Sequence, residues 1–296
     1  MMDNKPIIIV TGAAGQLGQE IQDVAPLFQD FHWRFFRRNE LDISNTAAVR
    51  STLESIRPWA VINTAAYTQV DAAEDALSEA QEINTSALGH LAQACKDFHV
   101  RLFHVSTDYV FDGTSSLPYT EEDVCHPINA YGQSKWEGEE AIRNMLKEHF
   151  IVRTSWLYSE YGSNFFKTIT RIAQQKSEIT VVNDQFGGPT WAGELADQLL
   201  KLARIAYQHD GQFYGTYHFS NNGMATWCEF AAEIVALQQL NCSVVPITTA
   251  QYPTRAKRPK MSKLNTSKWE ATVGPVSTWQ QALKNCIEKI TRKHKM

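Results

Sequence analysis

The sequence is poor in cysteine and lacks any long, uncharged apolar run. Its five cysteines are scattered, odd in number and without a C-x-x-C pair, so neither a disulfide framework nor a cysteine metal site is expected. Only four apolar residues, 7–10, precede Thr11-Gly12, too few for the apolar core of a signal peptide. No run approaches the ~20 residues of a membrane span. These absences predict a cytoplasmic protein without a membrane partner.

The sequence also lacks a strong charge of either sign. Its 28 lysines and arginines nearly balance 32 aspartates and glutamates, which leaves a formal net charge of -4. This balance gives no electrostatic reason to expect nucleic acid as a partner. With 43% hydrophobic residues among 296, the composition is typical of a globular protein with one large domain or two smaller ones.

Short apolar segments alternate with segments of helical character over the first half of the chain. Strands are predicted at 7–10, 33–36, 60–62 and 102–105, and helices at 16–28, 46–56 and 72–98. This alternation predicts an α/β fold with a Rossmann-type doubly wound parallel sheet, assigned to 1–155. Glycines break the later pattern into short pieces. We expect 156–296 to form mainly a smaller substrate-binding lobe, with some segments returning to the sheet.

The motif Thr11-Gly12-Ala-Ala-Gly15-Gln-Leu-Gly18 follows the first predicted strand and opens the first predicted helix. In that context glycines let the backbone approach a pyrophosphate, which the N–H groups and dipole of the helix N-terminus then hold. The spacing departs from G-x-G-x-x-G, and an ordinary glycine turn is the alternative. The motif predicts a dinucleotide cofactor beside Gly12, Gly15 and Gly18.

The end of the second predicted strand carries two arginines, Arg37 and Arg38, about 20 residues after the last glycine of the motif. Enzymes that use NAD usually place an acidic residue there against the ribose hydroxyls, whereas arginine suits the 2′-phosphate of NADP. The pair therefore favours NADPH, with NADH as the second choice and two plain surface arginines as the alternative. Asp42 and Ile43 follow and are candidates to bracket the adenine.

The stretch Tyr131-Gly-Gln-Ser-Lys135 places a phenol and an ammonium on one face of a helix. The unperturbed pKa of tyrosine is about 10, and a neighbouring cation lowers it. Such a pair is suited to protonate a carbonyl oxygen while a nicotinamide delivers hydride to the carbon. Thr107, in Ser106-Thr107-Asp108 after a predicted strand, is placed to bond the same carbonyl; a turn that closes the strand is the alternative.

Together these residues resemble the extended short-chain dehydrogenase/reductases, which mostly act on nucleotide sugars. Further strings are similar to the dTDP-4-dehydrorhamnose reductase family over nearly the whole chain. They are Ala66-Tyr-Thr-Gln-Val-Asp71, Ser106-Thr-Asp-Tyr-Val-Phe-Asp-Gly113, Arg153-Thr-Ser-Trp-Leu-Tyr158, Val182-Asn-Asp-Gln-Phe-Gly-Gly-Pro-Thr190 and Arg258-Pro259 with Leu264-Asn265. The resemblance implies that NADPH reduces the C4 ketone of dTDP-4-dehydro-β-L-rhamnose. The product, dTDP-β-L-rhamnose, would serve bacterial cell-surface polysaccharides such as lipopolysaccharide O-antigen.

The resemblance also implies roles for single residues. Tyr131 would donate the proton, Lys135 would hold the nicotinamide ribose and lower the pKa of the tyrosine, and Thr107 would orient the sugar carbonyl. Asp108 and Trp156 would touch the substrate. Residues carried over as cofactor contacts are Gly15, Gln16, Leu17, Asp42, Ile43, Ala65, Ala66 and Tyr67.

Substrate binding also requires groups that meet a nucleotide diphosphate. The basic run 255–260 is placed for this, and Arg258 within it falls in a family string; a solvated basic loop is the alternative. Gln185 and Thr190 are candidates for the sugar or the base. Some relatives are dimers with a bound divalent ion, so the resemblance leaves a homodimer and Mg²⁺ open. No carboxylate cluster in the sequence marks a metal site.

Two other functions stay open at this point. The β subunit of methionine adenosyltransferase, a non-catalytic NADP-binding regulator, shares the Tyr-Val-Phe-Asp-Gly and Tyr-x-x-x-Lys strings, and fold alone does not separate it from an enzyme. Thr107, Trp156 and the 184–190 string favour the enzyme. A reductase or epimerase on another nucleotide sugar is the second alternative. A dehydratase would carry Glu after Asp108, where this chain has Tyr109.

Overall fold

The centre of the molecule is a six-stranded parallel sheet. The computed structural model describes residues 5–209 and 212–293. Strand order is β10-β5-β4-β3-β1-β2, and every pairing is parallel. The strands are β1 (Ile7–Thr11), β2 (His32–Phe36), β3 (Ala60–Asn63), β4 (Arg101–Thr107), β5 (His149–Thr154) and β10 (Gly215–His218). The predicted doubly wound parallel sheet is confirmed.

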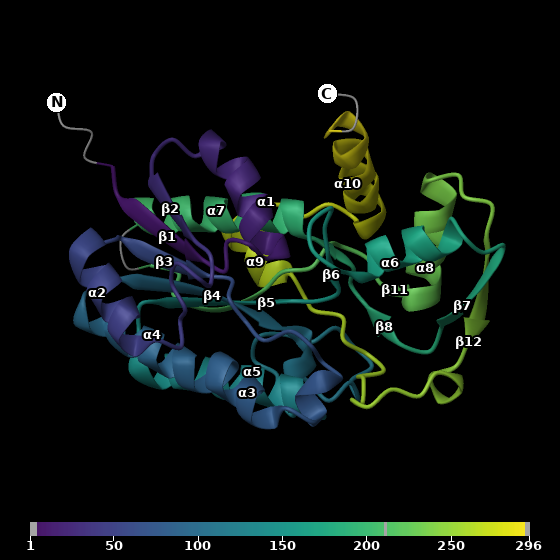
Figure 1. Ribbon diagram of the computed structural model, residues 1–296, viewed down its shortest axis with the longest axis horizontal. Helices are drawn as coiled ribbons and strands as arrows, with labels where there is room; N and C mark the ends of the chain where they lie inside the picture. The colour runs from purple at the N-terminus through teal and green to yellow at the C-terminus, as the bar shows by residue number, and fades with distance from the viewer. Residues whose placement is uncertain (1–4, 210–211, 294–296) are drawn as a thin grey trace.

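Both faces of this sheet are buried, which explains the apolar runs in its central strands. In β1, Ile8 and Val10 belong to one core and Ile9 to the other. One face is covered by α1 (Gln16–Val24), α7 (Ala192–Gln208) and α9 (Ser267–Thr272), and the other by α2 (Thr46–Ile56), α4 (Ala87–Asp97) and α5 (Ala130–Met145) (Figure 1). The chain order reverses between β1 and β3, so the loops that follow them diverge and leave a crevice at the carboxyl edge.

The single helix predicted over 72–98 is wrong, because the segment is interrupted. It consists of a 3₁₀ turn (Ala72–Glu74), α3 (Leu77–Gln81), a π-helical turn (Glu82–Ser86) and α4. At the π turn, the Asn84 side chain accepts from the Tyr67 N–H at 2.9 Å and donates to the Tyr67 carbonyl at 3.0 Å. This local irregularity ties the loop after β3 to the helix layer.

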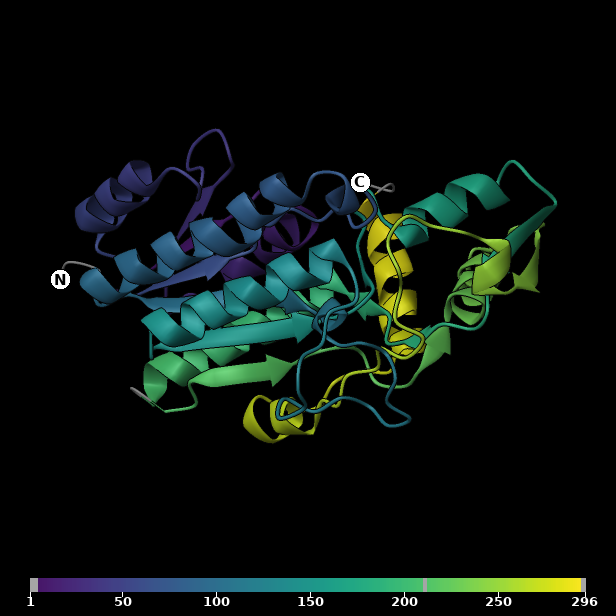
Figure 2. The ribbon, with the colours of Figure 1, turned by 90° about the horizontal axis from the view of Figure 1, so that it is seen from below.

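After β5 the chain builds a smaller lobe with its own core. The lobe contains α6 (Phe165–Ala173), β7 (Glu178–Val182), β8 (Phe186–Gly187), β11 (Ala225–Thr226), α8 (Trp227–Leu237), β12 (Ser243–Ile247) and α10 (Trp279–Lys293). The short strands β6 (Leu157–Tyr158) and β9 (Thr190–Trp191) pair with each other where the chain leaves the sheet. Between these pieces, α7, β10 and α9 return to the large sheet. In Figure 2, α10 stands between the sheet domain and the lobe.

Two findings bear on the setting of the protein. Across residues 5–209 and 212–293, the structure contains no helix long and apolar enough to cross a membrane. The five cysteines all carry free thiols, and Cys95 and Cys286 lie buried in two different cores.

Candidate active site

A cleft of about 720 Å³ opens at the carboxyl edge of the sheet. Its walls come from the glycine turn after β1, the loops after β2 and β3, the end of β4, the start of α5 and the segment after β5. These segments meet because parallel strands end at the same edge. The sequence-predicted residues that line the cleft are Gly12, Gly15, Gln16, Leu17, Arg38, Asp42, Ile43, Ala65, Ala66, Thr107, Asp108, Tyr131, Lys135 and Trp156.

The glycine turn brings the backbone close to the cleft. Gly12 has φ +71°, and a Cβ there would lie 2.6 Å from the Ala65 nitrogen. A Cβ at Gly18 would lie 2.4 Å from the Gly12 oxygen, so this glycine shapes the turn although it does not line the cleft. Gly15 caps α1 without any side-chain hydrogen bond to the first N–H groups. Those N–H groups therefore remain available to an anionic ligand.

The two arginines after β2 differ in position. Arg38 lines the cleft, and its Nε donates to Asp42 at 3.1 Å. Burial alone would raise the pKa of Asp42, but hydrogen bonds from Ser44 and Arg38 lower it below its usual range. Arg37 lies outside the cleft wall, and its backbone N–H donates to Glu40. Arg38 is thus the arginine placed to meet a cofactor phosphate.

The first turns of α5 place Tyr131 and Lys135 beside Thr107 at the end of β4. Asn129 caps this helix, and its Oδ1 accepts from the Gly132 N–H at 2.7 Å. A Cβ at Gly132 would lie 2.1 Å from a backbone oxygen just beyond β4, so the glycine permits the close approach of the helix. As a result, the Thr107 hydroxyl lies near enough to the Tyr131 phenol to lower its pKa.

The groups that shift the pKa of Tyr131 in this structure do not include Lys135, so its expected effect on the phenol stays a prediction. Burial raises the pKa of Tyr131 to about 12, and the Thr107 hydrogen bond offsets only part of that rise. The Lys135 Nζ is directed elsewhere: it donates to the Val105 carbonyl at 2.9 Å and lies 3.1 Å from Nε2 of His104. Burial also lowers the pKa of Lys135 to about 8. Thr107 is therefore the group that acts directly on the phenol.

Asp108 presents an unusual carboxyl group to the cleft. The side chain is buried, and the Thr107 hydroxyl donates to its Oδ1 at 3.1 Å. Within the described residues, its Oδ2 has no hydrogen-bond partner. Burial raises the pKa of Asp108 to about 7, although the nearby Ser262 and Thr107 hydroxyls act in the opposite direction. A buried carboxyl with one unused oxygen is suited to bond a polar group of a ligand.

An aromatic pair forms the lobe side of the cleft. Trp156 and Trp227 both line it, and their rings stack with centroids 3.5 Å apart and planes 6° apart. Trp156 holds a left-handed backbone with φ +47°, which is uncommon for a bulky residue. A Cβ at Gly187 would lie 2.5 Å from the Trp156 ring, so a glycine is required behind it. The sequence analysis missed Trp227, because no local motif marks it.

Several predicted residues lie outside the cleft wall: Gly18, Arg37, Tyr67, Gln185, Thr190 and Arg258. Gln185 is buried and donates to the Thr249 hydroxyl at 3.0 Å, while Thr190 is buried beside the Gly188 carbonyl at 3.3 Å. The backbone N–H and carbonyl of Tyr67 instead hydrogen-bond the side chain of Asn84.

The basic run 255–260 is not an open cationic surface. Arg258 holds Asp71 through two hydrogen bonds of 3.1 and 2.7 Å, and Arg255 pairs with Asp75. Both carboxylates belong to the segment after β3, so these pairs connect the C-terminal part of the chain to the sheet domain. The expected diphosphate contact at Arg258 would have to replace Asp71.

Comparisons with known proteins agree with this geometry. The family of the RmlD substrate binding domain matches residues 6–292. The chain belongs to the RmlD family. An RmlD-family relative, the dTDP-4-dehydrorhamnose reductase of Aggregatibacter actinomycetemcomitans, is 41% identical over 94% of this chain and 97% of its own. The dTDP-4-keto-6-deoxy-D-glucose reductase of Streptomyces niveus is 38% identical over 93% of this chain and 94% of its own. A dTDP-4-dehydrorhamnose reductase structure from Bacillus anthracis str. Ames in complex with NADP aligns with a TM-score of 0.91. The two chains are 36% identical, and the alignment covers 96% of this chain and 99% of the other.

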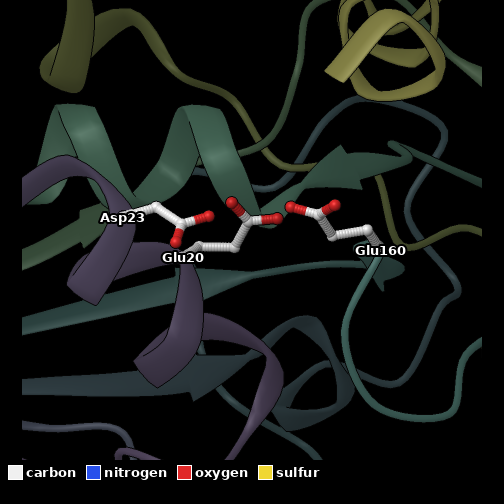
Figure 3. A group of neighbouring side chains, drawn as sticks. All are labelled: Glu20, Asp23 and Glu160. Atoms are coloured by element: carbon white, nitrogen blue, oxygen red, sulfur yellow. The ribbon is translucent and has the colours of Figure 1, made fainter. Parts of the chain in front are cut away.

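The structure of this RmlD-family chain also contains the carboxylate cluster that the sequence did not reveal. Glu20 and Asp23 of α1 meet Glu160 after β6, with ligand oxygens within 4.8 Å of one another (Figure 3). Lys289 of α10 places its Nζ 2.5, 2.7 and 3.0 Å from these three carboxylates in turn, and Lys293 reaches two of them. An ammonium already satisfies the cluster, so these residues do not fit the divalent ion that the resemblance left open.

Proposed function

We propose that the cleft is the active site of an NADPH-dependent reductase that converts dTDP-4-dehydro-β-L-rhamnose to dTDP-β-L-rhamnose. The observation that carries this proposal is the meeting of Thr107, Tyr131 and Lys135 in one cleft with the glycine turn of α1. Membership of the RmlD family supports the oxidoreductase class. The relative from Aggregatibacter actinomycetemcomitans supports the substrate, and the NADP complex from Bacillus anthracis supports the cofactor.

The sheet side of the cleft would hold the cofactor. The uncapped N-terminus of α1 would bind the pyrophosphate, and Arg38 would pair with the 2′-phosphate. Ala65 and Ala66 would line the cofactor beyond the glycine turn, with Lys135 on the nicotinamide ribose. NADPH, when bound, supplies the hydride that reaches the C4 carbon of the sugar.

Tyr131 would supply the proton that the reduction requires. The phenol is protonated at neutral pH, so its proton is available for transfer, and burial, which raises its pKa to about 12, makes it a weaker acid than a free tyrosine. As hydride reaches C4, the phenolic proton moves to the ketone oxygen, which becomes the hydroxyl of the product. The Thr107 hydroxyl, which donates to Asp108 in this structure, would turn to donate to the same oxygen and share the developing charge. Asp108 would use its unpaired oxygen for a sugar hydroxyl.

The lobe side of the cleft would hold the nucleotide sugar. We propose that residues 156–296 mainly serve this purpose, with Trp156 as the first contact because it lines the cleft. Gln185 and Thr190 would support the wall from behind it, since their side chains are buried and hydrogen-bonded. Arg258 reaches a diphosphate only by leaving Asp71, so it ranks below Trp156 and Asp108 as a substrate contact.

A reductase for a related sugar is the second candidate. The relative from Streptomyces niveus is named for dTDP-4-keto-6-deoxy-D-glucose, and its identity to this chain differs little from that of the first relative. The two substrates differ in the sugar and share the nucleotide and the ketone. We further propose a cytoplasmic setting, because all five thiols are free. A homodimer stays a prediction.

The experiment that tests the proposal measures NADPH oxidation by the purified chain with each of the two 4-keto sugars. The expected result is faster turnover of dTDP-4-dehydro-β-L-rhamnose, with dTDP-β-L-rhamnose as the product. Tyr131→Phe is expected to lower kcat by roughly 10²-fold or more while NADPH still binds. Preferred turnover of the other sugar would support the second candidate. Binding of NADPH without turnover of either sugar would contradict both.

A further inference from the structure

A row of polar side chains crosses the sheet beneath the cleft. Thr11, Asn63 and His104 are register partners on the neighbouring strands β1, β3 and β4. The Thr11 hydroxyl donates to Oδ1 of Asn63 at 2.6 Å, and the amide nitrogen Nδ2 of Asn63 lies 3.0 Å from Nδ1 of His104. His104 Nε2 then lies 3.1 Å from the Lys135 Nζ. We call these three strand residues the cross-strand row; it begins next to Gly12 and ends at Lys135.

We propose that His104 is a positioning residue for Lys135 and that the cross-strand row ties this lysine to the glycine turn. The inference rests on the proposed function, because it takes Lys135 as the group that holds the nicotinamide ribose. An ammonium group has three N–H donors. The Val105 carbonyl occupies one of them at 2.9 Å, and Nε2 of His104, at 3.1 Å, occupies a second when the ring proton is on Nδ1, which leaves one donor for a ligand in the cleft. Without His104 the ammonium would keep a single fixed acceptor and could rotate.

The chemistry of imidazole makes this contact sensitive to the charge of Lys135. His104 is fully buried, and burial and the neighbouring lysine hold its pKa well below the usual value, so the ring is neutral. A neutral ring has one donor and one acceptor nitrogen. In this structure the Asn63 amide nitrogen faces Nδ1, which makes Nδ1 the acceptor and leaves the ring proton on Nε2, an arrangement that suits an uncharged Lys135. A lysine ammonium requires the other tautomer, with Nε2 as acceptor and Nδ1–H, and therefore a flipped Asn63 amide that turns its oxygen to Nδ1.

The surroundings of Lys135 contain few other charges. Glu139, one turn later on α5, opposes the effect of burial on the pKa of Lys135. Glu139 is itself held by Arg153 in a buried ion pair of 2.7 Å. Tyr131 lies one turn earlier on the same helix, and Thr107 acts on its pKa. From β4, His104 is thus the side chain that contacts the ammonium directly.

A second buried histidine offers a matched control. His218 of β10 is also fully buried, and its Nε2 lies 3.3 Å from Arg153 while its Nδ1 lies 3.0 Å from the Tyr119 carbonyl. It therefore contacts a cation, but it does not line the cleft and does not touch Lys135. A purely structural role for buried histidines predicts similar consequences when either one is replaced.

The test compares His104→Phe, His104→Gln and His218→Gln in kcat, NADPH dissociation constant and pH profile. His104→Phe is expected to lower kcat roughly 10-fold to 10²-fold, the scale of a misplaced catalytic group, and to shift the alkaline limb of the profile. His104→Gln should recover most of kcat, because its amide oxygen can accept from Nζ. His218→Gln should leave the profile in place. Equal profiles in folded His104→Phe and wild type would overturn the inference.

A spectroscopic measurement separates this inference from the proposed function. Imidazole ¹⁵N shifts, with His104 assigned by its loss in His104→Gln, report which ring nitrogen carries the proton. In the wild type below pH 8, Nδ1 should be protonated, and Lys135→Met should change the shift of Nε2. An unchanged His104 signal in Lys135→Met would overturn the positioning role even if the reductase is active. A changed signal in a protein that reduces neither sugar would uphold the contact and reject the function.

Discussion

The two sides of the cleft are built by different means. On the sheet side, Gly12 and Gly18 let the backbone itself approach the ligand, and strand register sets where that backbone lies. On the lobe side, the wall is the stacked pair Trp156 and Trp227, whose place depends on packing between segments far apart in the chain. A cofactor met by backbone is therefore held by the core of the sheet. A substrate that contacts aromatic side chains is held by lobe residues, which can be changed without changing the sheet.

The largest expected effect tests whether the two sides are independent. In Gly18→Ala the new Cβ would meet backbone atoms at 2.4 and 2.7 Å, which cannot yield without opening the turn. We expect a loss of NADPH affinity of roughly 10²-fold, about 2.7 kcal/mol. In Gly187→Ala the Cβ would meet the Trp156 ring at 2.5 Å, and a side chain can move. The expected result there is a raised KM for the sugar with an unchanged NADPH dissociation constant.

Gly89→Ala is the control for both glycine variants. A Cβ at Gly89, in α4, would have its nearest neighbour at 3.6 Å, an ordinary contact, and alanine favours the helix. Its kinetic constants should equal those of the wild type. Isothermal titration with NADPH and steady-state kinetics with the sugar supply the measurements. Comparable loss of NADPH affinity in Gly18→Ala and Gly187→Ala would show that the two sides are not independent.

The next largest effect is expected at Lys289, where the sheet domain contacts α10. Lys289 binds carboxylates of α1 and of the segment after β6, so it connects the sheet domain to α10. Lys289→Gln removes this cation and is expected to destabilise the protein by roughly 3 kcal/mol, the lower range for breaking a buried pair. Three carboxylates would then face Lys293 alone and should bind a divalent cation, so Ca²⁺ or Mn²⁺ should raise the Tm of the variant and not that of the wild type.

Lys293→Gln separates the two lysines of this cluster. Its side chain is 46% exposed, against 24% for Lys289, so solvent screens its ion pairs more strongly. Its loss should cost less stability and should not create a cation site. An equal rise in Tm with Ca²⁺ in the wild type would mean that the cluster accepts a metal despite Lys289.

The same contrast explains what could be predicted from the sequence. The sheet, the glycine turn and the spacing of Tyr131 and Lys135 follow from local patterns, and the structure places these residues in one cleft. Trp227 and the cluster of Glu20 with Glu160 depend on segments more than 70 residues apart, so no local pattern marks them. The pKa of Tyr131 could not be predicted from the sequence either, because it depends on burial and on where the Lys135 Nζ points rather than on spacing.

A smaller effect concerns the choice of cofactor on the sheet side. Arg38 lines the cleft whereas Arg37 does not. Arg38→Ala is expected to lower the ratio of kcat/KM for NADPH over NADH by roughly 10-fold, since it would lose a charge-assisted contact to the 2′-phosphate. Arg37→Ala should leave this ratio nearly unchanged. If Arg37→Ala shifts the ratio and Arg38→Ala does not, the phosphate lies nearer the other arginine.

The smallest expected effect is on the pH dependence of stability. Two aspartates whose pKa values shift in opposite directions test it, Asp108 on the sheet side and Asp184 on the lobe side. Burial raises the pKa of Asp108 from 3.8 to about 7, so between these values the folded chain keeps a proton that the unfolded chain has lost. Stability must therefore fall as pH rises through this window. Asp108→Asn cannot ionise, and its Tm relative to the wild type should climb from pH 4 to about pH 7 and level off above.

The lobe-side aspartate should give the opposite sign. Hydrogen bonds from Thr249 lower the pKa of Asp184, so its carboxylate contributes stability above its usual pKa, and that contribution is lost as pH falls. The Tm of Asp184→Asn relative to the wild type should thus decrease as pH rises to about 4 and stay level above that value. Thermal unfolding of both variants at pH 2.5, 4, 5.5, 7 and 8.5 measures the two slopes. Parallel slopes would show that the Asp108 carboxyl is hydrated in the open cleft and ionises like a surface group.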